Sequence, residues 1–101
     1  MNEIELTKST EGQFLLSGIL DQKTVPIVWQ RKAQLKSDKN LVIDLAGITH
    51  SDSAGLAFLT CIQSDAMKSQ QSLSFINIPH QLQQLIQLSR LEDVLNTEQR
   101  L

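Results

Sequence analysis

The sequence predicts a small single domain of the α/β class, in which helices cover a mixed β-sheet. Short apolar segments alternate with longer segments of helical periodicity, which is the pattern of this class. The hydrophobic share of 41% is ordinary for a globular fold, and 101 residues suffice for one compact domain but not for two. We therefore expect residues 1–101 to form one domain.

The first third of the chain predicts a β-hairpin followed by a helix. Residues 3–7 alternate apolar and polar side chains, and after a turn at Glu11-Gly12 residues 13–18 form a second strand with Phe14 and Leu16 on one face. Thr24 is the expected N-cap of the helix, and Pro26 is tolerated because it falls in the opening turn. One face of this helix is expected to hold Val25, Val28, Trp29 and Ala33.

The remaining chain predicts two strands, each followed by a helix. Residues 41–45 are nearly all apolar, as in a central strand, and a polar turn leads from them to a helix over 53–67. Residues 73–78 form the last expected strand, and Pro79 opens the last helix. The expected order is β-β-α-β-α-β-α. Helices between consecutive strands imply parallel pairing through right-handed crossovers.

The segment NLVIDLAGITHSDSAGL, residues 40–56, bears most directly on function because it places Ser53 in the first turn of a helix. The first N–H groups of a helix lack internal partners, and the helix dipole makes that end partly positive. A hydroxyl there can cap the helix, contact a partner or carry a phosphate. These three alternatives stay open at this point.

The neighbours of Ser53 each have a structural and a functional interpretation. Asp52 is expected as the N-cap, which typically contributes ~1 kcal/mol. Gly55 lacks a side chain and would let another surface approach the helix start. Asp21 lies in a turn expected at the same end of the sheet, where it would stabilise the turn, bind a cation or help a kinase recognise the serine. Trp29 is either a core residue or an interface anchor.

Bulk properties exclude several classes of function. The net charge is −2 with acids and bases interspersed, so no nucleic-acid partner is expected. The apolar runs are far shorter than the ~20 residues that span a bilayer, so no direct membrane insertion is expected. The start, Met1 to Glu5, has no features of a secretory signal, and the single cysteine cannot form an internal disulfide. The expected compartment is the cytoplasm.

Catalytic and metal sites are not expected either. Residues 50–53 contain the letters of a hydrolase triad, but adjacent residues rarely reach that geometry and the nucleophile elbow G-x-S-x-G is absent. His50 and His80 have no partner at metal-ligand spacing, and Cys61 lies among apolar residues in a predicted helix. We expect no enzyme activity, no cofactor and no metal.

Three motifs, in their order along the chain, resemble the STAS domain, which anti-sigma-factor antagonists share with the cytoplasmic tails of sulfate transporters. SGILD at 17–21 resembles the family's G-x-L-D turn, and LVIDL at 41–45 resembles its hydrophobic-D-L strand. DSAGL at 52–56 resembles its D-S/T-S/T-G-L signature. The resemblance covers almost the whole chain and implies the STAS fold.

Within this family the chain is most similar to the MlaB branch, whose members have an S-G-x-L-D turn and then a Pro and a Trp in the first helix, here Pro26 and Trp29. The resemblance implies a non-catalytic subunit that binds the ATPase of a phospholipid-transport (Mla-type) ABC complex. Such a subunit would meet the permease and the inner membrane through the ATPase and help maintain outer-membrane lipid asymmetry. The implied partner-binding residues are Ser51, Asp52, Ser53, Ala54, Gly55, Trp29 and Asp21.

The antagonist branch implies a different role for the same serine. There the equivalent residue is phosphorylated, a second Ser or Thr usually follows it, and the partner is an anti-sigma serine kinase. Ser53 is the phosphorylation site in this alternative, but Ala54 stands at the next position. This departure weakens the antagonist alternative and leaves Ser53 itself in place.

Overall fold

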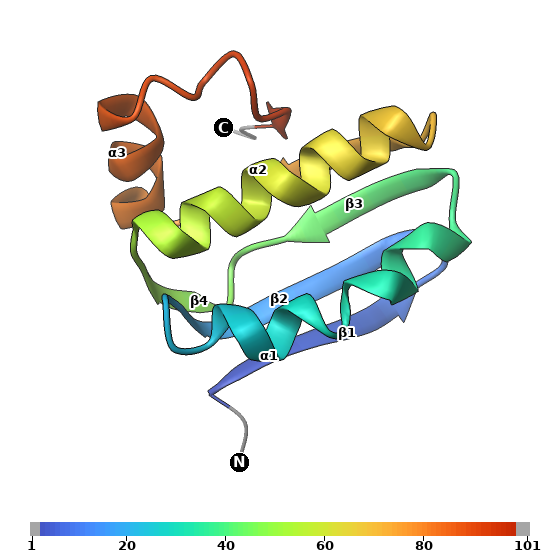
Figure 1. The fold of residues 1–101 in the computed structure, drawn as a ribbon, viewed down its shortest axis with the longest axis horizontal. Helices are drawn as coiled ribbons and strands as arrows, with labels where there is room; N and C mark the ends of the chain where they lie inside the picture. The colour runs from blue at the N-terminus through green and yellow to red at the C-terminus, as the bar shows by residue number, and fades with distance from the viewer. Residues whose placement is uncertain (1–2, 99–101) are drawn as a thin grey trace.

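The computed structural model describes residues 3–98 as a sheet with its main helices packed against it (Figure 1). The predicted α/β fold class with a mixed sheet is confirmed. The elements in chain order are β1 (Ile4–Thr10), β2 (Gln13–Leu20), α1 (Val25–Trp29), the 3₁₀-helix η1 (Lys32–Ser37), β3 (Asn40–Asp44), β4 (Ile48–Ser51), α2 (Ser53–Lys68), β5 (Ser72–Ile76), α3 (His80–Leu88) and β6 (Thr97–Glu98).

The sheet has the strand order β1-β2-β3-β5-β6, and β4 pairs with the far end of β2. The β1–β2 hairpin is antiparallel, as expected, and the other pairs are parallel. The register aligns Phe14 with Ile43 and Ile43 with Phe75. These three side chains form a continuous apolar row across the centre of the sheet, and all three are buried.

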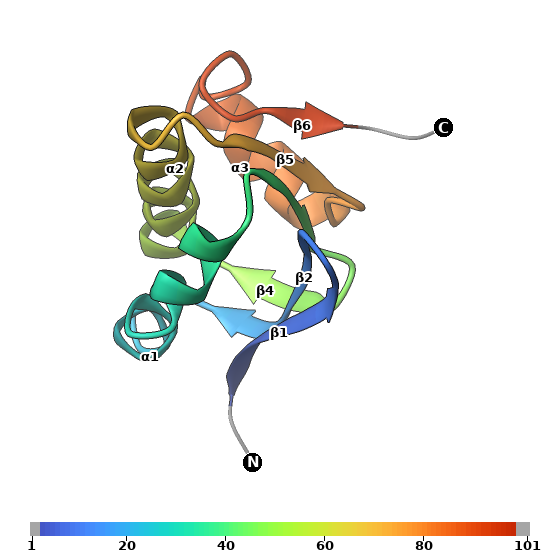
Figure 2. The ribbon, with the colours of Figure 1, turned by 90° about the vertical axis from the view of Figure 1, so that its right-hand side faces the viewer.

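Helix α2 covers this apolar row with one face. Its residues Phe58, Leu59 and Ile62 are buried in the same core as the row on the sheet. Figure 2 shows α1, η1 and α2 together on one side of the sheet, and α3 contacts both α2 and β4. Full burial of one such apolar side chain contributes roughly 1.5–3 kcal/mol, so this face dominates the stability of the fold.

Two short strands were not predicted from the sequence. The polar turn expected after residue 45 contains the strand β4. Strand β2 is longer than its partner β3, and β4 forms hydrogen bonds with the last residues of β2, which β3 does not reach. Strand β3 pairs with Gln13–Leu15, and β4 pairs with Gly18–Leu20. The other unpredicted strand, β6, is two residues long and pairs with β5. Neither segment is long enough to show a clear alternation of apolar and polar side chains.

The first helix is shorter than predicted. It ends at Trp29, and the chain continues as η1, so Ala33 is exposed and Leu35 is the buried residue of this segment. In a longer α-helix the Leu35 carbonyl would accept from the N–H four residues later. Here it accepts from the Gln71 side-chain amide instead (2.7 Å). Thr24 precedes the helix but does not cap it, because its hydroxyl donates to the Ile19 carbonyl instead (2.6 Å).

Candidate functional site

Asp52 fixes the start of α2 against the turn that follows β2. Its Oδ1 accepts from the Gly55 N–H (2.9 Å), which makes Asp52 the N-cap of the helix, as predicted. Its Oδ2 accepts from the Gln22 N–H (3.1 Å), and its own N–H donates to the Leu20 carbonyl (3.2 Å). These bonds join the helix start to the end of β2 and to the turn beyond it.

The environment of Asp52 stabilises its ionised form. Partial burial is the largest single influence and would raise the pKa of the carboxyl group. It is outweighed by the backbone N–H groups of Gly55, Gln22 and Ala54 and by the nearby His50, so the pKa is lowered from its ordinary value. Asp52 is therefore a carboxylate at neutral pH, which suits a helix cap rather than a proton donor.

Ser53 is the first residue of α2, and its side chain is exposed. Because Asp52 caps the helix, the Ser53 hydroxyl is not needed for that purpose, and it makes no hydrogen bond within residues 3–98. Of the three alternatives for this hydroxyl, capping is therefore excluded. Contact with a partner and phosphorylation both require the exposure that the structure shows.

Two of the predicted contact residues lie in the interior. Gly55 was expected to leave room for a partner, but that room is filled by this chain, since a Cβ there would lie 2.2 Å from the Leu20 carbonyl oxygen. Ser51 is 1% exposed, and its hydroxyl and N–H both donate to the Gln81 side-chain oxygen (3.1 Å each). Both residues position the helix start and present no side chain to a partner.

Asp21 lies in the turn that Asp52 holds, so the structure does bring the two predicted acids into one region. The Asp21 Oδ1 accepts from the N–H groups of Lys23 (2.9 Å) and Thr24 (3.1 Å). These bonds satisfy the carboxylate within its own turn. The turn-stabilising interpretation of Asp21 therefore accounts for its contacts.

Trp29 is an exposed neighbour of α2 rather than a core residue. Its side chain is 43% exposed and meets the Phe58 ring edge to face, with the ring centroids 6.1 Å apart. The Lys32 ammonium lies 3.9 Å from the centre of the indole ring. Trp29 thus flanks α2 more than one turn beyond Ser53. Ala54, beside Ser53, is half-buried.

Sequence reasoning missed the residues that support this site. The Gln81 side-chain amide also donates to the Ser51 carbonyl (2.8 Å) and ties α3 to β4. Phe58 supports the indole ring of Trp29. The partners are about thirty residues apart along the chain, so no local pattern reveals these contacts.

No group of three His, Cys, Asp or Glu side chains within residues 3–98 is arranged to hold a metal ion. None of the helices described there is long and apolar enough to cross a membrane.

The fold and the exposed serine at the start of α2 define a small α/β domain of the STAS class. A family model described as "Mlab, STAS domain" matches residues 7–97, and the chain belongs to this family. No curated protein is a significant match to the chain.

Solved structures of anti-sigma factor antagonists have the same fold. One from Mycobacterium paratuberculosis has a TM-score of 0.79 at 22% identity, over 95% of this chain and 86% of that one. SpoIIAA in its unphosphorylated form has a TM-score of 0.75 at 13% identity, over 97% of this chain and 88% of that one. The phosphorylated form of SpoIIAA from Bacillus has a TM-score of 0.70 at 13% identity, over 97% and 91%.

Proposed function

We propose that this chain is a non-catalytic subunit that binds the ATPase of an Mla-type phospholipid-transport ABC complex. It supports the assembly or activity of that complex and thereby the lipid asymmetry of the outer membrane. It is cytoplasmic and meets the permease and the inner membrane only through the ATPase. The match to the MlaB-described family supports this choice of partner.

The observation that carries the proposal is the uncharged, exposed face of α2 that begins at Ser53. The exposed residues on it are small, namely Ser53, Ala57, Cys61 and Ser64. Residues 53–64 include no Lys, Arg, Asp or Glu. Because charged residues are depleted at the centres of protein interfaces, this composition favours a protein partner over bulk solvent.

Helix α1 adds an aromatic side chain beside α2. Trp29 is 43% exposed and packs against Phe58 of α2. Trp is enriched among residues that dominate binding energy. Ser53, the uncharged face of α2 and Trp29 together form what we call the α1–α2 surface, to which we assign the ATPase.

Affinity purification of the tagged chain from its own host, in mild detergent, tests this assignment. The wild type should retain an ABC ATPase and its permease, identified by mass spectrometry. Ser53→Arg should lose both, because a long cation would stand at the edge of the uncharged face. Ser9→Arg is the matched control, since Ser9 is also exposed but lies in β1, toward the opposite end of the sheet. Full recovery of the ATPase with Ser53→Arg would contradict the proposal.

A second candidate function is an anti-sigma-factor antagonist switched by phosphorylation of Ser53. It is favoured by the exposed, unbonded hydroxyl of Ser53 and by the similarity to antagonists, one of them in a phosphorylated form. Phosphate would add roughly −1.5 to −2 charge, which the helix N-terminus favours and the adjacent Asp52 carboxylate opposes. Incubation with ATP and an anti-sigma serine kinase from the same host, followed by mass spectrometry, tests whether Ser53 is phosphorylated. Phosphate on Ser53 would support the switch, and its absence would reject it.

A further inference from the structure

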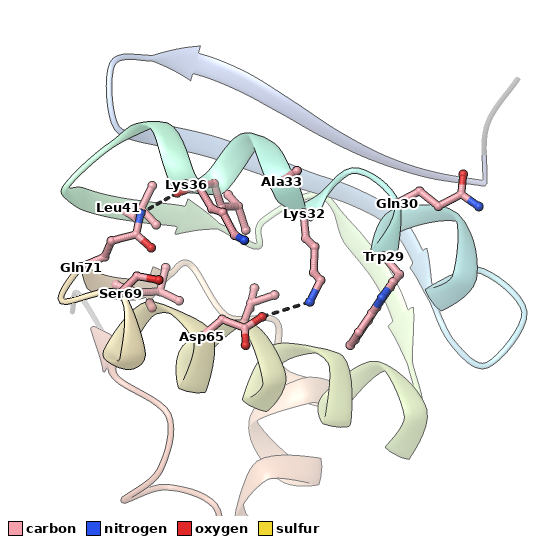
Figure 3. Close-up of a pocket in the computed structure, with 13 residues that line it drawn as sticks. Trp29, Gln30, Lys32, Ala33, Lys36, Leu41, Asp65, Ser69 and Gln71 are labelled. Atoms are coloured by element: carbon pink, nitrogen blue, oxygen red, sulfur yellow. Dashed lines mark hydrogen bonds and ion pairs between the residues drawn. The ribbon is translucent and has the colours of Figure 1, made fainter.

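A cavity of about 150 Å³ opens between η1 and the C-terminal half of α2, away from Ser53 (Figure 3). Its floor is apolar and comes from four elements of the fold. The floor residues are all buried, and they are Leu35, Leu41, Ile62, Ala66 and Leu73. An apolar floor of this kind binds apolar groups because their transfer out of water is favourable.

One wall of the cavity is the Trp29 side chain. The indole ring is supported by Phe58 on one side and by the Lys32 ammonium, which also pairs with Asp65 (3.0 Å). Figure 3 shows Lys32 reaching from η1 to Asp65 on α2, with Trp29 beside this pair. The ring is thus held in place as a flat aromatic surface.

The cavity is preformed because hydrogen bonds fix η1 at a distance from α2. The Gln71 side-chain amide donates to the carbonyls of Leu35 (2.7 Å) and Asp38 (2.6 Å). Gln71 itself lines the cavity. No rearrangement of η1 is needed for a ligand to enter, which lowers the cost of binding.

The rim of the cavity is cationic. Lys36 lines it and has no ion pair among the residues the structure describes, while Lys32 is paired with Asp65 and Asp38 with Lys8. Residues 31–36 contain three bases, Arg31, Lys32 and Lys36, and no acid. An anion at the rim would therefore gain a charge-assisted hydrogen bond from the Lys36 ammonium.

We infer that this cavity binds a small aromatic carboxylate, with its ring on the apolar floor beside Trp29 and its carboxylate at Lys36. A cavity of about 150 Å³ lined by apolar side chains accepts a molecule the size of benzene. The volume selects a single ring, the indole favours an aromatic one, and the rim selects a negative charge. This inference goes beyond the proposed function and does not depend on it.

Titration with benzoate tests the inference, and the chain supplies its own reporter. Trp29 is the only tryptophan and there is no tyrosine, so the intrinsic fluorescence comes from the cavity wall. Benzoate should change it saturably, with a dissociation constant in the millimolar range or tighter. The backbone amides of Ala33, Lys36 and Ala66 should shift in the ¹H–¹⁵N NMR spectrum with the same constant.

Two other probes separate the ring from the charge. Acetate carries the charge without the ring and should bind much more weakly than benzoate. Benzyl alcohol carries a ring without the charge and should bind about three- to fivefold more weakly, as expected for the loss of one exposed charge pair. An equal response to acetate would mean a simple anion effect, and an equal response to benzyl alcohol would mean that the charge is not selected. Either result, or no saturable response to benzoate, would overturn the inference.

Variants of the cavity complete the test. Lys36→Met keeps the aliphatic stem and should weaken benzoate about three- to fivefold, the range for an exposed charge pair. Lys39→Met is the matched control, because Lys39 does not line the cavity, and it should leave the affinity unchanged. Ala66→Leu fills the floor and should abolish binding. If that variant does not fold, Ala33→Leu at the exposed rim provides the same block, and undiminished benzoate binding by a folded filled variant would contradict the assignment.

Discussion

The two ends of α2 differ in how closely they meet the rest of the chain. At the N-terminal end, Gly55 lies in contact with Leu20, and the Asp52 carboxylate bonds to the backbone on both sides. At the C-terminal end, long polar side chains such as Gln71 and Lys32 hold η1 apart from the helix, and a cavity remains. The same helix is thus closely packed at one end and loosely packed at the other.

The difference shows how one helix can serve two kinds of surface. Close packing at the N-terminal end fixes the backbone of Ser53 and leaves its hydroxyl free, which suits contact with a protein partner. Loose packing at the C-terminal end leaves a space with an apolar floor, which suits a small ligand. If this account is right, substitutions that add side-chain volume should cost much more stability at the N-terminal end than at the C-terminal end.

Adding side-chain volume should produce the largest contrast. Gly55→Ala should lower the free energy of unfolding by about 3 kcal/mol, because the new Cβ would overlap the Leu20 carbonyl and the backbone must move. Ala66→Leu should change it by less than about 1 kcal/mol, since the added atoms enter the cavity. Urea denaturation of both variants measures the contrast. Equal losses of unfolding free energy in Gly55→Ala and Ala66→Leu would show that the two ends of α2 are packed equally closely.

Removing the helix cap should have the next largest effect. Asp52→Ala should lower the free energy of unfolding at pH 7 by about 1 kcal/mol, because the Gly55 N–H loses its acceptor. Asp52→Asn should lose less, since Asn also caps helices well. Urea denaturation at pH 7 compares the wild type with both variants. An unfolding free energy of Asp52→Ala equal to that of the wild type would rule out Asp52 as the cap.

The same variants predict a pH dependence. The pKa of Asp52 is lowered in the folded state, so its ionised form stabilises the fold at pH values above the unfolded pKa of about 3.9. This contribution is lost as the pH falls from there through the folded pKa. The difference in unfolding free energy between wild type and Asp52→Asn should therefore shrink below about pH 4. A difference that stays constant from pH 7 to pH 3 would contradict the lowered pKa.

The smallest effect on stability is expected at the polar supports of the cavity. Lys32→Met removes the ion pair with Asp65 and the contact with the Trp29 ring, and it should cost about 1 kcal/mol or less because both groups are partly exposed. The loss should diminish in high salt, which screens the ion pair. Lys36→Met should cost nothing measurable. Urea denaturation of the two variants at low and high salt measures this difference. Equal losses of unfolding free energy in Lys32→Met and Lys36→Met would show that Lys32 does not support Trp29.

Local patterns in the sequence predicted the larger elements and the helix cap. The apolar stretch of β3, the alternation in the hairpin and the Asp52-Ser53 start of α2 depend on neighbouring residues, and the structure confirms them. The roles of Gly55 and Ser51 were not predictable in this way, because they depend on Leu20 and Gln81, which are thirty or more residues away along the chain. The cavity escaped prediction for a related reason, since it follows from the break between α1 and η1 and from the Gln71 contacts.

The central claim is that the exposed hydroxyl of Ser53 serves a partner and not the fold. Its most direct test measures, on the same samples, the affinity for the Mla-type ATPase and the free energy of unfolding of wild type and Ser53→Arg. We predict that the unfolding free energy falls by about 1 kcal/mol or less, the range for an exposed cation at the partly positive start of a helix. We also predict that the dissociation constant rises about thirtyfold or more, because the new charge would have no partner in an otherwise uncharged contact surface. An unchanged dissociation constant in a stably folded variant would contradict the claim.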